Sequence, residues 1–437
     1  MSVLSKNSIK GYFKQFALHD RALLVLSIIL QSVLGFLFGH IYDQRIYMAT
    51  GFLVGTGQNP YVPQDLTAVF HNTFFQGMTS IGYPPPWPLI LGLVYRSVYL
   101  AIPNLLIYNL AIKIPIIAAN ICLAYLVSAI LKDMRVEQAV SRQAWLFILF
   151  NPLLLYTTAA WGQFDSIVAL LVLIGLVLLD AGRPDLSAIL LALSLSFKPT
   201  ALPVVPVVIV YSIGKSPLKA IRYVLIFFAS LLLFCITPFF IFGWDPAPIW
   251  NNWNAHFSVG GGISLLSFYE LFKDTYVLPG NWWLVGLIWI PALGIAMLGL
   301  RQGVAGLRDL LRKSAALILV LFLTRTWLSE PNIVLLLPFL VILVSLGELH
   351  PLALTAIWLI PLFFTVFNTS PPQLLFPSFP EAMEKILHWS DKFRTLRLVL
   401  RTALVIPWQI AGWWIVVTCL RKKQPAGQKA HSSAQIA

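Results

Sequence analysis

The residue best placed to do chemistry in this sequence is Asp43. It follows the first strongly apolar segment, residues 23–41, and opens a polar connection that runs to the proline-rich sequence at 83–87. A carboxylate at the mouth of a membrane helix is costly unless it is solvated, paired or used in function. An ionised carboxylate can take a proton from a hydroxyl, so Asp43 could serve as a general base. A long connection headed by an acid is more typical of an active site than of a simple linker.

Four further polar segments interrupt the apolar sequence, and each carries a side chain that could bind a substrate. These segments are 83–86, 161–166, 196–200 and 325–332, and the candidate residues are Tyr83, Gln163, Asp165, Lys198, Arg325 and Glu330. Lysine can hold a lipid phosphate as a point charge, and arginine can fork onto two phosphate oxygens. Ionisable groups at membrane depth are functional by default. We therefore predict that these residues bind substrate beside Asp43.

The charged members of this set also have structural interpretations. Asp165 could cap a helix that starts at the next residue, by accepting backbone N–H bonds. Lys198 stands before a helix-breaking proline and could satisfy freed backbone carbonyls or extend toward the interface. Arg325 and Glu330 could form an ion pair that holds two helices together. The sequence favours a functional role for Arg325 and leaves the role of Asp165 open.

The histidines and cysteines give no sign of a metal centre. His71, in the connection after Asp43, has no second histidine or cysteine at metal-binding spacing, so we expect a solvated loop histidine. Cys122, Cys235 and Cys419 all lie in apolar runs and are expected to be small core residues, without disulfide or metal roles. No cofactor is predicted, and the sequence gives no support for a divalent metal.

Apolar helices must position these groups. Of the 437 residues, 58% are hydrophobic and only 11% are charged, whereas a soluble domain carries about 25% charged residues. Apolar runs long enough to cross a bilayer recur along nearly the whole chain. Segments in lipid must be helical, because an open strand edge cannot be satisfied there. The sequence therefore predicts an all-α polytopic membrane protein.

The net charge of +13 could indicate a nucleic-acid partner, but the positions of the basic residues argue against one. Lysines and arginines cluster at the ends of apolar runs, as the positive-inside rule requires, and could attract anionic lipid. Placing these clusters in the cytoplasm gives about twelve transmembrane helices with both termini inside. The predicted spans are 22–41, 105–131, 143–160, 165–181, 184–198, 200–213, 219–242, 281–300, 314–328, 331–347, 351–367 and 397–420.

The threading also predicts how the connections are organised in a single domain, residues 1–437, of a multi-pass protein of the cell membrane. Residues 1–21 and 421–437 are cytoplasmic. The first external loop is 42–104, with residues 88–103 forming a helix in the outer leaflet. Two more external loops follow, at 243–280 and 368–394. All the candidate site residues then fall at the outer membrane boundary, although their positions were not used to build the threading.

Short motifs connect this pattern with a known class. The residues that carry the resemblance are Asp43, the stretch 57–61 (Gly-Gln-Asn-Pro-Tyr), Tyr83-Pro84-Pro85, the stretch 161–165 (Trp-Gly-Gln-Phe-Asp) and Lys198-Pro199. The chain resembles the GT-C class of membrane glycosyltransferases, and within it the bacterial and archaeal polyprenol-phosphate-mannose-dependent mannosyltransferases. The resemblance spans most of residues 20–345. Each motif alone is short and moderately specific.

The resemblance implies a membrane glycosyltransferase that acts on the non-cytoplasmic side and inverts the anomeric carbon. The donor would be a hexose, expected to be mannose, on a polyprenyl phosphate, and the acceptor a glycolipid, a polysaccharide or a protein. The acid of the first external loop is the catalytic base in the family, which corresponds to Asp43. Many relatives carry a second acid two residues away, whereas this sequence reads Tyr42-Asp43-Gln44-Arg45. The family's later histidine motif is replaced by residues 325–332.

A secondary transporter or lipid flippase is the main alternative function. Such a protein would also have about twelve spans, broken helices and buried charges. The sequence shows no obvious inverted repeat, and its ionisable residues gather at one face and not at the midplane. A transporter also has no need of a long first loop headed by an acid. The sequence therefore favours the transferase.

Overall fold

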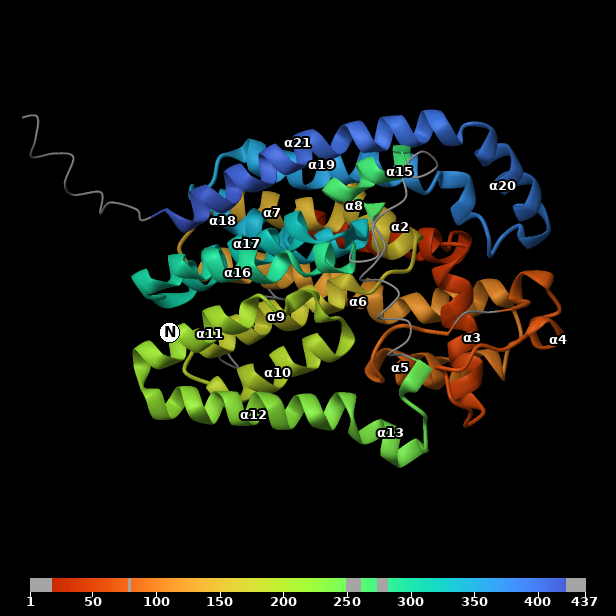
Figure 1. Cartoon of the computed structure of the whole chain (residues 1–437), viewed down its shortest axis with the longest axis horizontal. Helices are drawn as coiled ribbons and strands as arrows, with labels where there is room; N and C mark the ends of the chain where they lie inside the picture. Colours follow the sequence, from red (N-terminus) through yellow and green to blue (C-terminus); the bar gives the residue numbers. More distant parts are fainter. Residues whose placement is uncertain (1–17, 78–79, 249–260, 273–281, 422–437) are drawn as a thin grey trace, which may run out of the picture.

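A computed structural model describes residues 18–77, 80–248, 261–272 and 282–421 (Figure 1). Most of these residues, 79%, are helical, and the predicted all-α membrane class is confirmed at that level. The first elements are α2 (Leu18–Leu37), α3 (Asp43–Gly55), α4 (Thr67–Phe70), η1 (Thr73–Phe75), α5 (Pro86–Val94), η2 (Tyr95–Tyr99), α6 (Leu105–Asp133), α7 (Gln138–Phe150), α8 (Pro152–Leu154) and η3 (Leu155–Ala160). The central elements are α9 (Asp165–Asp180), α10 (Pro184–Phe197), η4 (Pro199–Ala201), α11 (Val204–Lys215), α12 (Pro217–Cys235) and α13 (Thr237–Phe242).

The second half of the chain continues the helical pattern with two short strands. Its elements are β1 (Gly261–Gly262), η5 (Leu265–Phe268), α15 (Tyr269–Phe272), η6 (Trp282–Leu287), α16 (Trp289–Met297), η7 (Leu298–Gln302), α17 (Gly306–Thr324), β2 (Trp327–Leu328), η8 (Glu330–Leu335), α18 (Leu337–Ser345), α19 (Pro351–Asn368), η9 (Pro371–Leu374), η10 (Pro380–Ala382), α20 (Met383–Lys392) and α21 (Arg394–Leu420). β1 pairs with β2 in parallel, Gly261 opposite Trp327. Parts of the predicted 243–280 loop lie outside the described residues.

Seven helical segments of the described chain are long and apolar enough to cross a membrane. They are Asp20–Leu37, Leu105–Asp133, Gln138–Ala160, Pro217–Phe242, Leu284–Gln302, Pro351–Asn368 and Arg394–Leu420. Shorter apolar helices lie at Pro184–Phe197, Val204–Lys215 and Glu330–Ser345, where the sequence also predicts spans. The number of twelve crossings stays a prediction, because these shorter helices fall below the usual spanning length.

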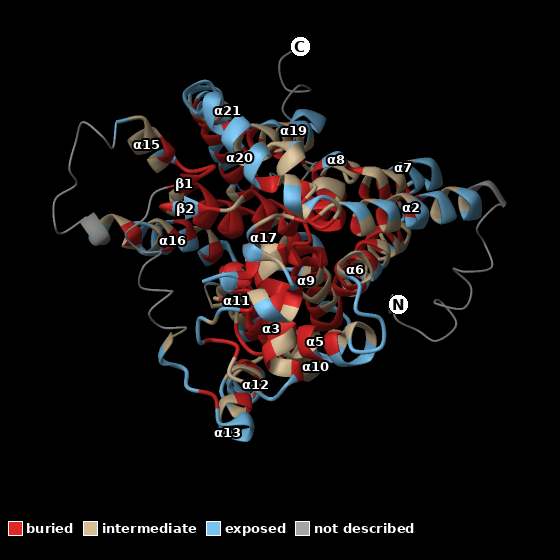
Figure 2. Cartoon of the chain, turned by 90° about the vertical axis from the view of Figure 1, so that its right-hand side faces the viewer, coloured by how far each residue is buried: buried red, intermediate tan, exposed pale blue. Residues whose placement is uncertain are grey.

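The long helices lie side by side, while α3 crosses their direction at one end of the molecule, where it packs on α5 (Figure 1). Buried residues occupy the middle of the bundle around α9, α17 and α6, and exposed residues cover its outside (Figure 2). The outer surface is apolar on several helices, as shown by Leu218 on α12 and Phe240 on α13, which are 75% and 82% exposed. Apolar side chains facing outward are what a lipid environment favours.

The first predicted external loop contains ordered helices. α3 packs on α5, and a Cβ atom added to Gly92 of α5 would come within 2.3 Å of Val54 Cγ1, so glycine permits this close approach. The predicted surface helix at 88–103 is observed as α5 and the π-helix η2, beginning earlier because Pro86 suits the first helical turn. Whether this segment lies at the outer face stays a prediction.

One predicted span is wrong in its boundaries. The sequence placed a span at 314–328, but α17 runs from Gly306 to Thr324. Its charged first half is accommodated because Arg312 pairs with Asp309 at 2.8 Å and Lys313 donates to the carbonyl of Gly303. The helix ends before Arg325, and the chain then becomes extended to pair with β1.

Segments from the last quarter of the chain contact the end of α2. The backbone N–H of Gly39 donates to the Leu374 carbonyl at 2.6 Å. The hydroxyl of Ser378 donates to the Leu37 carbonyl at 2.6 Å. These contacts fix the position where α2 ends and the turn toward Asp43 begins.

Candidate active site

Asp43 is the first residue of α3, immediately after a short turn that follows α2. Its backbone N–H lies 3.3 Å from His40 Nδ1, which accepts this bond only when Nδ1 carries no hydrogen; with a hydrogen on Nδ1, His40 donates to the Asp43 carboxylate instead. The amino end of a helix carries a partial positive charge, which favours a carboxylate there. The sequence placed Asp43 in a loop, whereas the structure places it on a regular element that holds its position.

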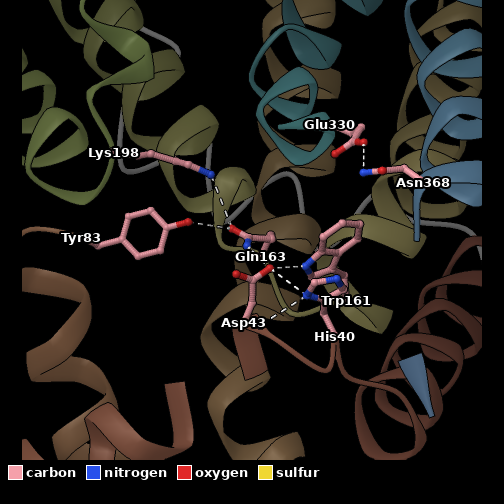
Figure 3. Close-up of polar contacts among 8 residues, drawn as sticks. All are labelled: His40, Asp43, Tyr83, Trp161, Gln163, Lys198, Glu330 and Asn368. Atoms are coloured by element: carbon pink, nitrogen blue, oxygen red, sulfur yellow. Dashed lines mark hydrogen bonds and ion pairs between the residues drawn. The ribbon is translucent and has the colours of Figure 1, made fainter. Parts of the chain in front are cut away.

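The two carboxylate oxygens of Asp43 differ in their surroundings. Oδ2 accepts hydrogen bonds from Trp161 Nε1 at 2.6 Å and Gln163 Nε2 at 2.9 Å, and His40 Nδ1 lies 3.2 Å away (Figure 3). Oδ1 has no hydrogen-bond partner among the described residues. The side chain is 18% exposed, so one oxygen is held and the other is accessible.

Three neighbours keep this carboxylate ionised. Burial raises the pKa of Asp43, but the hydrogen bond and charge of His40 and the hydrogen bonds of Trp161 and Gln163 oppose it and leave the pKa below its ordinary value. Donors that bond the charged form stabilise that form. At neutral pH Asp43 is therefore a proton acceptor and not a proton donor.

A sharp change of backbone direction delivers Trp161 and Gln163 to Asp43. The π-helix η3 ends at Ala160, and Gly162 follows with a φ of +104°, a conformation that glycine adopts without strain. A Cβ atom at this position would also lie 2.4 Å from Gln44 Oε1. The ring of His40 stacks on Trp161 with centroids 4.1 Å apart, so the two donors support each other.

A buried ion pair stands behind Gln163. Lys198 Nζ lies 2.9 Å from both oxygens of Asp165, and the two side chains are 8% and 0% exposed. Gln163 Oε1 lies 3.5 Å from Lys198 Nζ and from the hydroxyl of Tyr83 (Figure 3). These donors surround the amide oxygen and direct the amide N–H₂ toward Asp43.

Five of the seven predicted site residues thus belong to one network: Asp43, Tyr83, Gln163, Asp165 and Lys198. The alternative that Asp165 caps a helix starting at Ser166 is wrong, because α9 starts at Asp165 itself and the acid bonds Lys198. α10 ends at Phe197, as the following proline predicted. Lys198 is fully paired, so its charge is already balanced by Asp165.

Arg325 and Glu330 lie outside this network, and the proposed ion pair between them is absent. Arg325 follows the end of α17 and is half-buried, and its guanidinium has no hydrogen bond or ion pair within the part of the chain that the structure describes. Glu330 Oε1 instead accepts a hydrogen bond from Asn368 Nδ2 at 2.7 Å (Figure 3). Asn368 Oδ1 in turn accepts from Arg401, which pairs with Glu270.

Sequence reasoning missed two of the donors to Asp43. His40 stands three residues before the acid, and that spacing at the end of an apolar segment was an available signal. Trp161 was part of a quoted motif, but its indole N–H could not be assigned a partner without the fold. Across the described residues, no group of three His, Cys, Asp or Glu side chains is arranged to hold a metal ion.

Comparison with known proteins bears on the first half of the chain. Residues 42–214 match the family model described as alpha-(1->6)-mannopyranosyltransferase, N-terminal domain. The match includes Asp43, Tyr83, Gln163, Asp165 and Lys198, begins two residues after His40, and ends before Arg325 and Glu330. A search of curated proteins found no match.

The match supports an enzyme of the glycosyltransferase class that moves mannose, and with the apolar helices it supports a membrane protein. It gives no support to the transporter alternative.

Proposed function

We propose that this protein transfers mannose from a polyprenyl-phosphate carrier to an acceptor hydroxyl, with inversion, on the non-cytoplasmic side of the cell membrane. Asp43 is the general base. The observation that carries the proposal is the division of its carboxylate, with Oδ2 bonded to N–H donors and Oδ1 accessible. Such an arrangement orients one lone-pair-bearing oxygen toward a substrate.

The reaction is a single displacement. Oδ1 accepts the proton of the acceptor hydroxyl while the acceptor oxygen forms a bond to the anomeric carbon. The bond between that carbon and the phosphate oxygen breaks, and the polyprenyl phosphate leaves with the electron pair. A retaining enzyme needs a second free carboxylate as nucleophile. Asp165 cannot supply it, because both of its oxygens bond Lys198.

A carboxylate with a lowered pKa suits this role when proton transfer is late. The acceptor hydroxyl becomes more acidic as its oxygen bonds to the anomeric carbon, so a weak base can take the proton in the transition state. A strongly basic group is not required, and the hydrogen bonds that lower basicity also fix geometry. Orientation of this kind contributes a large part of a catalytic rate.

Arg325 is the residue we propose for the departing phosphate. Its guanidinium is half-buried and unpaired in the described structure, and an uncompensated arginine of this kind favours an anionic ligand. Lys198 was also expected to bind phosphate. Its balanced pairing with Asp165 supports a role in orienting Gln163 instead. The donor lipid, the acceptor and the outward orientation with both termini in the cytoplasm belong to this proposal.

The donor class can be tested directly with purified protein in detergent or nanodiscs. The protein is incubated with radiolabelled polyprenyl-phosphate mannose, polyprenyl-phosphate glucose and GDP-mannose, together with a crude membrane lipid fraction as acceptor source. We expect consumption of polyprenyl-phosphate mannose and release of polyprenyl phosphate. Consumption of the nucleotide sugar alone would refute the carrier-lipid mechanism, and consumption of the glucose donor alone would refute mannose.

A further inference from the structure

A second buried lysine lies behind the Asp43 network. Lys113 is in the first half of α6 and is 0% exposed. Its ammonium group donates to the backbone carbonyl of Phe38 and, at 2.8 Å, to that of Ala160. No carboxylate pairs with it among the described residues. Burying an ammonium group in a membrane helix costs free energy, so a physical reason is needed for a lysine at this position.

The two carbonyls that bond Lys113 stand at the ends of two helical segments. α2 ends at Leu37, one residue before Phe38, and η3 ends at Ala160. Carbonyls at the carboxyl end of a helix lack intrahelical partners and carry partial negative charge. A cation between two such ends satisfies both, which offsets part of the cost of its burial.

The same two chain ends lead directly to the donors of Asp43. His40 comes two residues after Phe38, and Trp161 comes directly after Ala160. The backbone N–H of His40 also donates to the Trp161 carbonyl at 3.1 Å. A Cβ atom at Gly162 would lie 3.0 Å from Lys113 Cε, so the lysine stem packs against the turn that delivers Gln163. Lys113 therefore contacts both chain segments that lead into the site, the one after α2 and the one after η3.

Asn109, one turn earlier on α6, makes a useful contrast. Its Nδ2 lies within hydrogen-bond distance of the carbonyls of Gly35, Phe36 and Phe38, at 2.6, 3.1 and 2.8 Å. All three acceptors lie at or just after the end of α2, so Asn109 secures one chain end only. Lys113 joins that end to the end of η3.

We propose that Lys113 is a positioning residue for the transfer reaction, which fixes His40 and Trp161 relative to Asp43 Oδ2 by clamping the ends of α2 and η3. It does not touch substrate, because its ammonium group is enclosed by backbone carbonyls. The proposal rests on the proposed function of Asp43 as the base. If the proposal is correct, loss of Lys113 lowers turnover and leaves the binding of the donor unchanged.

The test compares Lys113→Met with Lys313→Met in the full-length protein. Lys313 of α17 is a matched control, because it is also buried, 2% exposed, and donates to a backbone carbonyl, that of Gly303, which follows the end of η7. Methionine keeps the stem volume and removes the charge. We measure kcat, the KM for polyprenyl-phosphate mannose, and amide hydrogen exchange of peptides that cover 38–43 and 160–165.

We expect Lys113→Met to lower kcat about 10²-fold, as a displaced catalytic group does, with donor KM little changed. Exchange should accelerate in the two site peptides and stay unchanged elsewhere. Lys313→Met should leave kcat and these two peptides as in the wild type. Equal behaviour of the two variants would overturn the proposal, and so would a loss confined to donor KM.

Hydrogen exchange separates this proposal from the proposed function. If the wild type transfers no mannose, the proposed function fails, but faster exchange in the two peptides of Lys113→Met would still support the clamp. If Lys113→Met does not reach the membrane, Lys113→Gln is measured in its place, because it retains an amide donor that reaches less far. Unchanged exchange and turnover in Lys113→Gln, with a folded protein, would then count against the clamp.

Discussion

Replacing Asp43 by asparagine should abolish mannose transfer while leaving the protein folded. The amide oxygen of asparagine can accept the N–H bonds of Trp161 and Gln163 that Oδ2 now receives. Its N–H₂ group then takes the place of Oδ1 and offers a hydrogen where the acceptor hydroxyl needs a base. We expect kcat to fall by about 10²–10⁴-fold, which corresponds to about 2.7–5.4 kcal/mol of lost transition-state stabilisation.

Asp43→Ala separates catalysis from stability at the same position. It removes both oxygens, so the indole N–H of Trp161, a residue 4% exposed, loses its acceptor. An unsatisfied buried donor costs about 1–3 kcal/mol. The alanine variant should therefore unfold at lower temperature than the wild type, whereas the asparagine variant should unfold close to it.

The assay follows release of polyprenyl phosphate from polyprenyl-phosphate mannose by purified protein, with thermal unfolding measured on the same samples. Asp65→Asn is the control, since Asp65 is an exposed acid in the same connection between α3 and α5. It should leave both turnover and unfolding unchanged. Turnover of folded Asp43→Asn within a few-fold of wild type would refute the assignment of the base.

Three more predictions follow from the same geometry. Lys198→Met leaves Asp165 as an unpaired buried charge and should destabilise the protein by roughly 3–5 kcal/mol, whereas the double variant with Asp165→Asn should recover much of that loss; equal unfolding of the single and double variants would contradict the pair. In a cysteine-free background, an impermeant maleimide applied to intact cells should label cysteine at exposed Thr56 and not at exposed Gln302; the reverse pattern would invert the topology. Because the pKa of Asp43 is lowered, kcat/KM should stay level as the pH falls from 7 to about 5. Its decline at acid pH should have a midpoint below the ordinary aspartate pKa of about 3.9. A decline with its midpoint near neutral pH would assign the base to another group.

Much of the fold follows from patterns in the sequence. Apolar runs of spanning length predicted the helical membrane class, because lipid leaves the backbone no other means of satisfying its polar groups. The end of α10 was also predictable, because Pro199 stops a helix before it. The boundaries of α17 were not predictable in this way. Its first half contains Arg308, Asp309, Arg312 and Lys313, which indicate a loop until their partners in space are known.

The sequence was enough to predict which residues belong to the site, but not what each of them does there. Asp43, Gln163 and Lys198 were chosen because polar residues at the boundary of a membrane need a reason, and the structure brings them into one network. Their roles depended on pairing across long sequence separations, such as the contact of Lys198 with Asp165. Spacing along the chain cannot reveal such pairs. The same limit hid Lys113, which the sequence presents as one ionisable residue inside an apolar run.

The contacts that hold the end of α2 have a consequence for how this chain can be divided. The family match ends at residue 214, but the turn before Asp43 is bonded to Leu374, and Tyr156 of η3 donates to the Thr369 carbonyl at 2.6 Å. A fragment that ends at the family boundary would lack these acceptors and leave both chain ends of the site unsupported. We therefore expect the first half of the chain to need the second for a well-ordered site, because Thr369 and Leu374 supply these acceptors. Exchange of either half between related enzymes should succeed only when the residues that make these contacts, around Gly39, Tyr156, Thr369 and Leu374, are exchanged with it.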